Sequence, residues 1–144
     1  MSHVDMVEIE VKSLNALKEA CAALGLSFQD GQKTYAWYGT SVGDYPLPKG
    51  MTKADLGKCA HAIKVPGASY EIGVVQDKQT GNFGLVYDFW GTTQGEPIMK
   101  RLGKGLEKLR AEYAAQAAIE QAQRRGLRVT RTLLPDNRLR LRIQ

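Results

Sequence analysis

The sequence predicts one α+β domain spanning residues 1–144, in which two helices pack on a mostly antiparallel sheet. Three observations lead to this class. Two apolar runs flank a polar turn within residues 69–90, helical periodicity occurs before and after them, and strand-like alternation occurs near both chain ends. A chain of 144 residues can bury a core without help from disulfides or a metal ion.

Residues 69–90 form the expected centre of the sheet, with the sequence SYEIGVVQDKQTGNFGLVYDFW. Gly81 in its polar middle can adopt the positive φ that a hairpin loop needs. Both flanking runs are apolar on both faces, as Val74 and Val75 illustrate in the first and Leu85 and Val86 in the second. Strands of this kind lie mid-sheet with both faces covered.

The amino-terminal part predicts a strand followed by a helix. Residues 4–11 alternate valine and isoleucine with glutamate, which is the period of a half-buried strand. Ser13 is a suitable N-cap for a helix over residues 14–24, and Gly25 stands where a left-handed residue ends a helix.

Three short strands are then expected, at residues 26–29, 34–38 and 59–65, the first two around a turn at Asp30 and Gly31. The run YAWYGT at residues 35–40 resembles YDFWGT at residues 87–92. Their neighbours do not repeat, so we interpret the two runs as aromatic strand ends that leave the sheet through glycine turns.

Residues 39–57 are rich in glycine and proline and predict a long irregular loop, a kind of segment that is more often functional or disordered than idle. Thr52 and Asp55 have the spacing of a capping box, which would hold one helical turn. Tyr45 and Lys49 are candidate ligand-binding residues, because a loop of this length can enclose a ligand.

The carboxyl-terminal part predicts a long helix and a second hairpin. Pro97 is well placed as a first helical residue, and apolar side chains recur at helical spacing up to Gly126, which predicts one helix of roughly 28 residues. Gly103 and Gly105 would weaken its first turns. Residues 127–134 and 139–143 predict the terminal hairpin, with its turn at Pro135.

Positive charge is concentrated at this end. The net charge is +5, and the last 21 residues contain Arg124, Arg125, Arg128, Arg131, Arg138, Arg140 and Arg142. Alternation along a strand would place Arg138, Arg140 and Arg142 on one face, joined by Arg128 from the neighbouring strand, as a stripe able to bind phosphate. The alternative is an edge sheet that charge keeps from aggregating.

His61, Glu71 and Asp88 are the candidate catalytic residues. Glu71 and Asp88 lie on opposite arms of the central hairpin and could act as acid and base, or could instead accept hydrogen bonds from backbone or arginine at a sheet end. Cys59 and His61 would point the same way from a strand, although no third group completes a nucleophilic site. A half-buried histidine with a structural role is the alternative for His61.

The sequence predicts no metal site and no cofactor. Cys21 and Cys59 have neither ligand spacing nor a disulfide framework. There is no signal peptide pattern and no apolar run of the ~20 residues that span a bilayer, so we expect a cytoplasmic protein without a membrane partner.

The chain resembles the uncharacterised family of the hypothetical chloroplast frame thirty-five protein, which occurs in algal plastids, cyanobacteria, other bacteria and some phages. The resemblance follows short motifs along nearly the whole chain: Met1-Ser2-His3, the helix at 14–24, Asp55-Leu56, Tyr70-Glu71-Ile72-Gly73, Phe89-Trp90, Tyr113-Ala114 and Arg140-Leu141. It implies a single α+β domain in a cytoplasm-like compartment and no established activity. This chain departs from the plastid pattern by extra residues at about 40–53.

Taken together, these features favour a small non-enzymatic binding or accessory protein whose ligand is anionic, either a small nucleotide or nucleic acid. A nucleotide-processing enzyme or hydrolase that uses His61, Glu71 and Asp88 is one alternative, and a structural subunit of a larger complex is another. A homodimer is a further possibility. Helices cover only one face of the predicted sheet, so the other face has to be covered by a partner, the long loop or a second copy of the chain.

Overall fold

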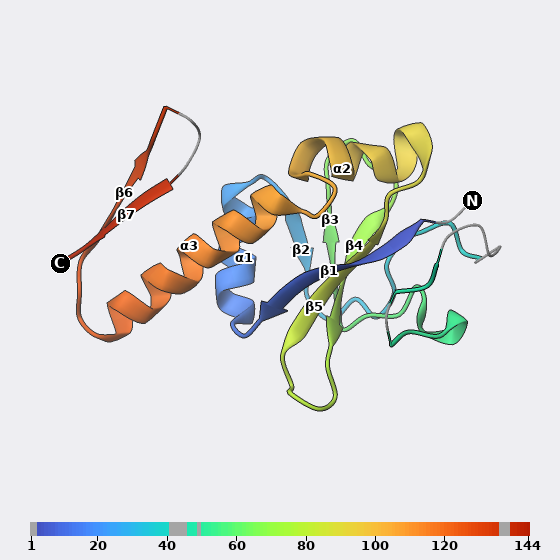
Figure 1. Ribbon diagram of the computed structural model, residues 1–144, viewed down its shortest axis with the longest axis horizontal. Coiled ribbons are helices and arrows are strands. Elements are labelled where there is room, and N and C mark those ends of the chain that lie inside the picture. The colour runs from blue at the N-terminus through green and yellow to red at the C-terminus, as the bar shows by residue number, and fades with distance from the viewer. Residues whose placement is uncertain (1–2, 41–45, 49, 136–138) are drawn as a thin grey trace.

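The computed structural model describes residues 3–40, 46–48, 50–135 and 139–144 (Figure 1). The elements in chain order are β1 (Val4–Val11), α1 (Leu14–Ala23), β2 (Ser27–Gln29), η1 (Lys53–Asp55), β3 (His61–Lys64), β4 (Glu71–Gln76), β5 (Phe83–Asp88), η2 (Gly91–Gly95), α2 (Glu96–Leu102), α3 (Glu107–Arg124), β6 (Val129–Leu133) and β7 (Leu139–Ile143). Strands β1 to β5 form an antiparallel sheet in the order β1-β5-β4-β3-β2, and β6 pairs with β7 in a separate hairpin. The α+β class is confirmed, and β4 and β5 lie mid-sheet as predicted.

The helices cover one face of the five-stranded sheet. Their apolar side chains enter one buried cluster with those of the strands: Leu17 from α1, Ile98 and Leu102 from α2, Leu109 from α3, and Ile63, Ile72 and Leu85 from the sheet. Ser13 caps α1 as predicted, because its Oγ accepts the N–H of Ala16 at 3.1 Å. The same Oγ donates to Glu120 of α3 at 2.9 Å, so α3 is held against the start of α1.

The other face of the sheet is covered by the chain itself. Tyr35 and Leu56, from the segment between β2 and β3, pack with Val4 and Val86 in a second buried cluster. The Tyr35 ring lies so close to the sheet that a Cβ on Gly73 would stand 2.5 Å from it. Of the three covers expected for this face, a partner, the long loop or a second copy, the chain itself supplies one, and the homodimer stays a prediction.

Residues 34–38 do not form the predicted strand. Only Thr34 makes a bridge there, to Lys58, and no ladder follows: Tyr35 donates to the carbonyl of Gly57, while Ala36 and Tyr38 donate to side-chain carboxylates of the sheet. The aromatic residues that favoured a strand are used to cover the sheet face. The predicted capping box is confirmed: Thr52 and Asp55 hold the single turn η1.

The predicted long helix is two helices, α2 and α3, separated by residues 103–106. Gly103 has φ 96°, and Leu106 adopts the left-handed conformation with φ 53° although it is fully buried. Burial of the Leu106 side chain outweighs the cost of that conformation, which is about 1 kcal/mol. The glycines therefore end the first helix, rather than only weakening it, and both helices can pack on the core.

The β6–β7 hairpin lies apart from the five-stranded sheet, with α3 between them (Figure 1). Among the described elements its neighbour is α3. None of the helices within the described ranges is both long and apolar enough to cross a membrane.

Candidate functional site

The register of the terminal hairpin places three of the predicted arginines on one face. Thr130 pairs with Arg142 and Thr132 with Arg140, and the backbones of Arg128 and Gln144 bond to each other in both directions at 2.8 and 2.9 Å. Paired residues of an antiparallel ladder point to the same side. We call this set the arginine face: Arg128, Thr130, Thr132, Arg140 and Arg142. Arg138, Tyr45 and Lys49, which were predicted to bind with it, lie outside the described residues.

The opposite face of the hairpin carries Val129, Arg131, Leu133, Leu141 and Ile143. Arg131 reaches α3, where its Nη2 donates to Oε1 of Glu112 at 2.9 Å. Glu112 is only 8% exposed, whereas a third of the Arg131 side chain is exposed, so this ion pair is partly buried. It therefore fixes which side of the hairpin faces the body and which faces outward.

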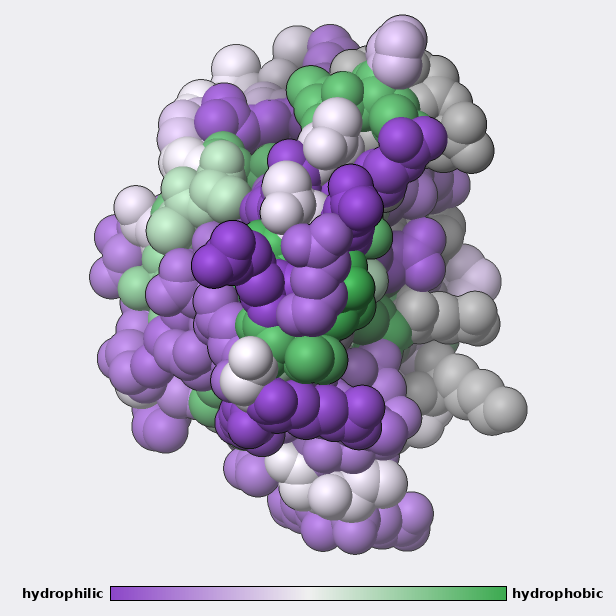
Figure 2. Space-filling model, turned by 90° about the vertical axis from the view of Figure 1, so that its left-hand side faces the viewer, coloured by the Kyte–Doolittle hydropathy of each residue, from purple (hydrophilic) through white to green (hydrophobic). Residues whose placement is uncertain are grey.

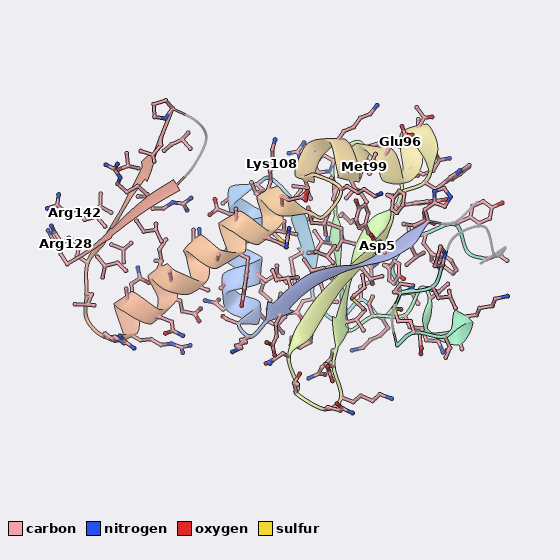
Figure 3. All side chains as sticks on the ribbon, viewed as in Figure 1. Asp5, Glu96, Met99, Lys108, Arg128 and Arg142 are labelled. Atoms are coloured by element: carbon pink, nitrogen blue, oxygen red, sulfur yellow. The ribbon has the colours of Figure 1, made fainter. Side chains whose placement is uncertain are left out.

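The side chains of the arginine face are exposed and their charge is not neutralised. Within the described ranges no carboxylate pairs with Arg128, Arg140 or Arg142, whereas Arg124 pairs with Glu120 at 3.3 Å and Arg131 with Glu112. Figure 3 shows Arg128 and Arg142 side by side at the outer end of the molecule, pointing away from α3. Unpaired guanidinium groups in water are available to an anionic partner.

The arginine face is one side of a two-stranded hairpin and lines none of the best-formed hollows of the described surface. Four hollows on the described surface lie elsewhere: beside η2, between β1 and the β4–β5 turn, between α3 and the base of the hairpin, and beside the turn after β3. A face without walls suits an extended ligand better than a small molecule, because small ligands are usually held in clefts that bury most of their surface.

The hollow beside η2 was not foreseen from the sequence. Its volume is about 730 Å³, and Phe89, Trp90 and Lys104 line it together with Glu96 and Met99, which are labelled in Figure 3. The Nζ of Lys104 lies 4.8 Å above the Phe89 ring. The aromatic residues at the end of β5 are the only sequence feature that points to this hollow, and they were interpreted as a strand end that leaves the sheet.

Cys59 and His61 do not point the same way, which corrects the expectation for this pair. Strand β3 begins at His61, so Cys59 precedes its regular alternation. The Cys59 Sγ donates to the carbonyl of Gln32 at 3.2 Å beneath the segment that covers the sheet. The His61 ring lies on the helix side, 5.3 Å from Phe28 and 5.8 Å from Phe83, and its Nδ1 accepts the N–H of Gly31.

Burial raises the pKa of the Cys59 thiol to about 11. At pH 8 such a group is about 0.1% thiolate, so we expect iodoacetamide to modify Cys59 on the order of 100-fold more slowly in the folded protein than in urea. Time-resolved peptide mass spectrometry would measure both rates. Rapid labelling of Cys59 in the folded protein would contradict this environment.

Asp88 is fully buried and accepts three backbone N–H groups. Its Oδ1 accepts from His3 at 2.9 Å and from Trp90 at 3.0 Å, and its Oδ2 accepts from Tyr38 at 3.1 Å. Tyr38 and Trp90 are equivalent positions of the two similar aromatic runs, and their rings meet edge to face at 5.5 Å. The carboxylate thus joins both runs to the start of β1.

Glu71 has a similar arrangement. Its Oε1 accepts the N–H of Ala36 at 2.8 Å and the side-chain amide of Gln32 at 3.0 Å. Both carboxylates therefore have the backbone partners that the structural alternative predicted, and together they hold the segment that covers the sheet.

The structure does not bring His61, Glu71 and Asp88 together. His61 pairs with Val74, whose side chain belongs to the helix-side cluster, whereas Glu71 and Asp88 alternate with residues of that cluster and lie on the other face. The sheet itself separates the histidine from both carboxylates. In the described ranges no three His, Cys, Asp or Glu side chains gather as a metal site would require.

Comparison of the chain with protein-family models, curated proteins and solved structures found no match.

Proposed function

We propose that this chain is a non-enzymatic nucleic-acid-binding protein and that the arginine face is its binding surface. The observation that carries the proposal is the set of three exposed arginines, Arg128, Arg140 and Arg142, on one open face of a hairpin. They have no carboxylate partner within the described ranges, and the β6–β7 hairpin that carries them lies at the end of the molecule away from the five-stranded sheet (Figure 1).

The spacing of these arginines suits a polymer of phosphates. Arg140 and Arg142 are two residues apart on β7, which is about 6.8 Å along a strand. Successive phosphates of one nucleic-acid strand are separated by a sugar and lie several ångström apart, so two arginines on one strand face can each contact a different phosphate. Thr130 and Thr132 lie opposite Arg142 and Arg140 on the neighbouring strand and offer hydroxyl groups for further phosphate contacts.

A small nucleotide is the less favoured ligand, because the arginine face has no walls to enclose it. The hydrolase alternative is also disfavoured, since His61 lies on the opposite side of the sheet from Glu71 and Asp88. A cytoplasmic location is part of the proposal and agrees with the two free thiols of Cys21 and Cys59.

The salt dependence of binding tests the proposal. Replacing Arg128, Arg140 and Arg142 together by glutamine removes three phosphate contacts, which lowers the magnitude of the slope of log K against log salt by about 2.7. We expect affinity at 0.1 M salt to fall on the order of 100-fold. Fluorescence anisotropy of labelled oligonucleotides between 50 and 200 mM salt measures both quantities.

The matched control removes the same charge elsewhere. Lys53, Lys58 and Lys78 are exposed and lie near η1 and the β4–β5 turn, far from the hairpin. Their triple replacement by glutamine should leave the slope nearly unchanged. Equal effects of the two triple variants would show that net charge alone drives binding, and a shallow slope with a mononucleotide as the best ligand would favour the small-ligand alternative.

A further inference from the structure

Strand β6 of the terminal hairpin has one unpaired edge. The backbones of Arg128 and Gln144 bond to each other in both directions, and such pairs alternate along an antiparallel ladder with pairs that share no bonds. Every second residue of β6 therefore turns its N–H and C=O groups away from β7. These residues are Val129, Arg131 and Leu133. Within the described part of the chain no strand lies on that side of β6.

The hairpin by itself is an incomplete sheet. Two strands alone are only marginally stable in water, and a further strand or a packed helix is needed. The polar contact with α3 is one partly buried ion pair, between Arg131 and Glu112. Figure 2 looks onto this end of the molecule and shows hydrophobic surface set among hydrophilic side chains. Three of the five large apolar side chains that the described residues expose belong to this end: Leu127, Leu133 and Ile143. A further strand would stabilise the hairpin.

We propose that a second copy of this chain pairs with the open edge of β6, so that two hairpins form one four-stranded antiparallel sheet in the order β7-β6-β6-β7. The pairing centres on Arg131 of both copies, and it joins Val129 to Leu133 and Thr130 to Thr132 of the second copy. This register pairs all five residues of β6. It also brings outward-pointing backbone groups of one strand opposite outward-pointing groups of the other, as antiparallel pairing requires. The inference does not depend on the proposed function.

The side chains of β6 are compatible with this pairing. Thr130 lies opposite Thr132 of the second copy on one face, and Val129 lies opposite Leu133 on the other; threonine pairs and apolar pairs both stabilise a sheet. Arg131 lies opposite Arg131 of the second copy. Each of these guanidinium groups has a carboxylate partner in its own chain, because Nη2 of Arg131 donates to Oε1 of Glu112 at 2.9 Å. The central charges are therefore compensated.

Charge selects the edge of β6 over the edge of β7. Pairing of β7 with a second β7 around Leu141 would place Arg140 directly opposite Arg142 of the second copy, and like charges in that position destabilise a sheet. When β6 pairs instead, the two β7 strands are three strand spacings apart, about 14 Å. That separation exceeds the Debye length of about 8 Å at physiological salt. The arginine faces of both copies then lie on the same side of the four-stranded sheet.

The mass of the full-length protein in solution is the first test. Native mass spectrometry and sedimentation at micromolar concentration should give twice the 15.9 kDa of one chain. The variant Val129→Pro removes an outward N–H and leaves the bonds to β7 in place. Because two-fold symmetry loses two hydrogen bonds, we expect the dimer to weaken by about tenfold or more. Ile143→Pro is the matched control, since Ile143 pairs with Val129 and turns its N–H to the other edge of the hairpin. It should leave the dimer unchanged.

A crosslinking experiment tests the register itself. Thr130→Cys and Thr132→Cys proteins are mixed in equal amounts under oxidising conditions, and peptide mass spectrometry identifies the disulfides. The mixture should form a disulfide between the two substituted positions, because directly opposed residues lie within the Cα distance that a disulfide spans. Either protein alone should crosslink much less, since equivalent positions of the two copies are diagonal neighbours about 7–8 Å apart.

Several results would overturn this inference. A monomeric mass without the mixed disulfide would do so, as would assemblies larger than a dimer, a dimer that Val129→Pro leaves intact, or efficient crosslinking of Thr130→Cys with itself. Each of these would leave the proposed function standing. A dimer with the expected disulfide that binds no nucleic acid would support the inference and overturn the proposed function.

Discussion

Replacing Asp88 by asparagine is expected to reduce the free energy of unfolding by about 3 kcal/mol or more. The carboxylate accepts N–H groups from His3, Tyr38 and Trp90 at a fully buried position. Hydrogen bonds to a charged group contribute about 1.5–3 kcal/mol each. An asparagine keeps one acceptor oxygen but turns an NH2 group toward a backbone N–H, so at least one buried donor loses its partner.

Urea unfolding followed by tryptophan fluorescence would measure this change. Asp77→Asn is the control, because Asp77 accepts the N–H groups of Gln79 and Thr80 in an exposed turn. We expect that variant to remain within about 1 kcal/mol of the parent. If Asp88→Asn were as stable as Asp77→Asn, Asp88 would not hold the aromatic runs to the sheet. The expected loss also means that reduced turnover in an Asp88 variant would be no evidence for catalysis.

Replacing Arg131 by leucine is expected to release the terminal hairpin from α3. The ion pair with Glu112 is the polar contact between them that the described residues provide, and Glu112 is only 8% exposed. Removing Arg131 leaves the buried Glu112 carboxylate without its partner, and the cost is smaller than the about 3–5 kcal/mol of a fully buried pair because a third of the Arg131 side chain is exposed. Because β6 and β7 form a sheet separate from β1 to β5, we expect hydrogen exchange in β6 and β7 to accelerate far more than in β4 and β5.

Two variants make this expectation specific. The double variant with both Arg131 and Glu112 replaced by leucine should recover most of the protection, because no buried charge remains. Arg128→Leu should change protection little, since Arg128 is exposed and has no carboxylate partner within the described ranges. If Arg131→Leu exchanged no faster than Arg128→Leu, the pair would not anchor the hairpin.

The same alternation gives the arginines of the hairpin two different tasks. Arg131 points to α3 and fixes the hairpin, while Arg128, Arg140 and Arg142 point outward. A variant set that neutralises all of them would combine loss of structure with loss of binding. Experiments on function should therefore leave Arg131 in place.

The local elements were determined by residues close together in the sequence. The turn with Gly81 joins the central strands, Ser13 caps α1, and Thr52 with Asp55 closes a single turn, all as predicted. Each depends on a hydrogen bond or a backbone preference within a few residues, which is why the sequence alone was enough. The grouping of Arg128, Arg140 and Arg142 on one face followed from strand alternation for the same reason.

What only the tertiary structure decided is which distant groups meet. Residues 34–38 look like a strand, but Glu71 and Asp88 bind their backbone and hold them across the sheet. The start of β3 at His61 sets which face the histidine occupies, and it separates His61 from both carboxylates. These outcomes depend on two requirements. Buried polar groups need hydrogen-bond partners, which lie up to 85 residues away in the sequence. Each apolar face of the sheet also has to be covered by a segment of the chain that can reach it. The identities of residues that are neighbours in the sequence do not indicate such distant contacts.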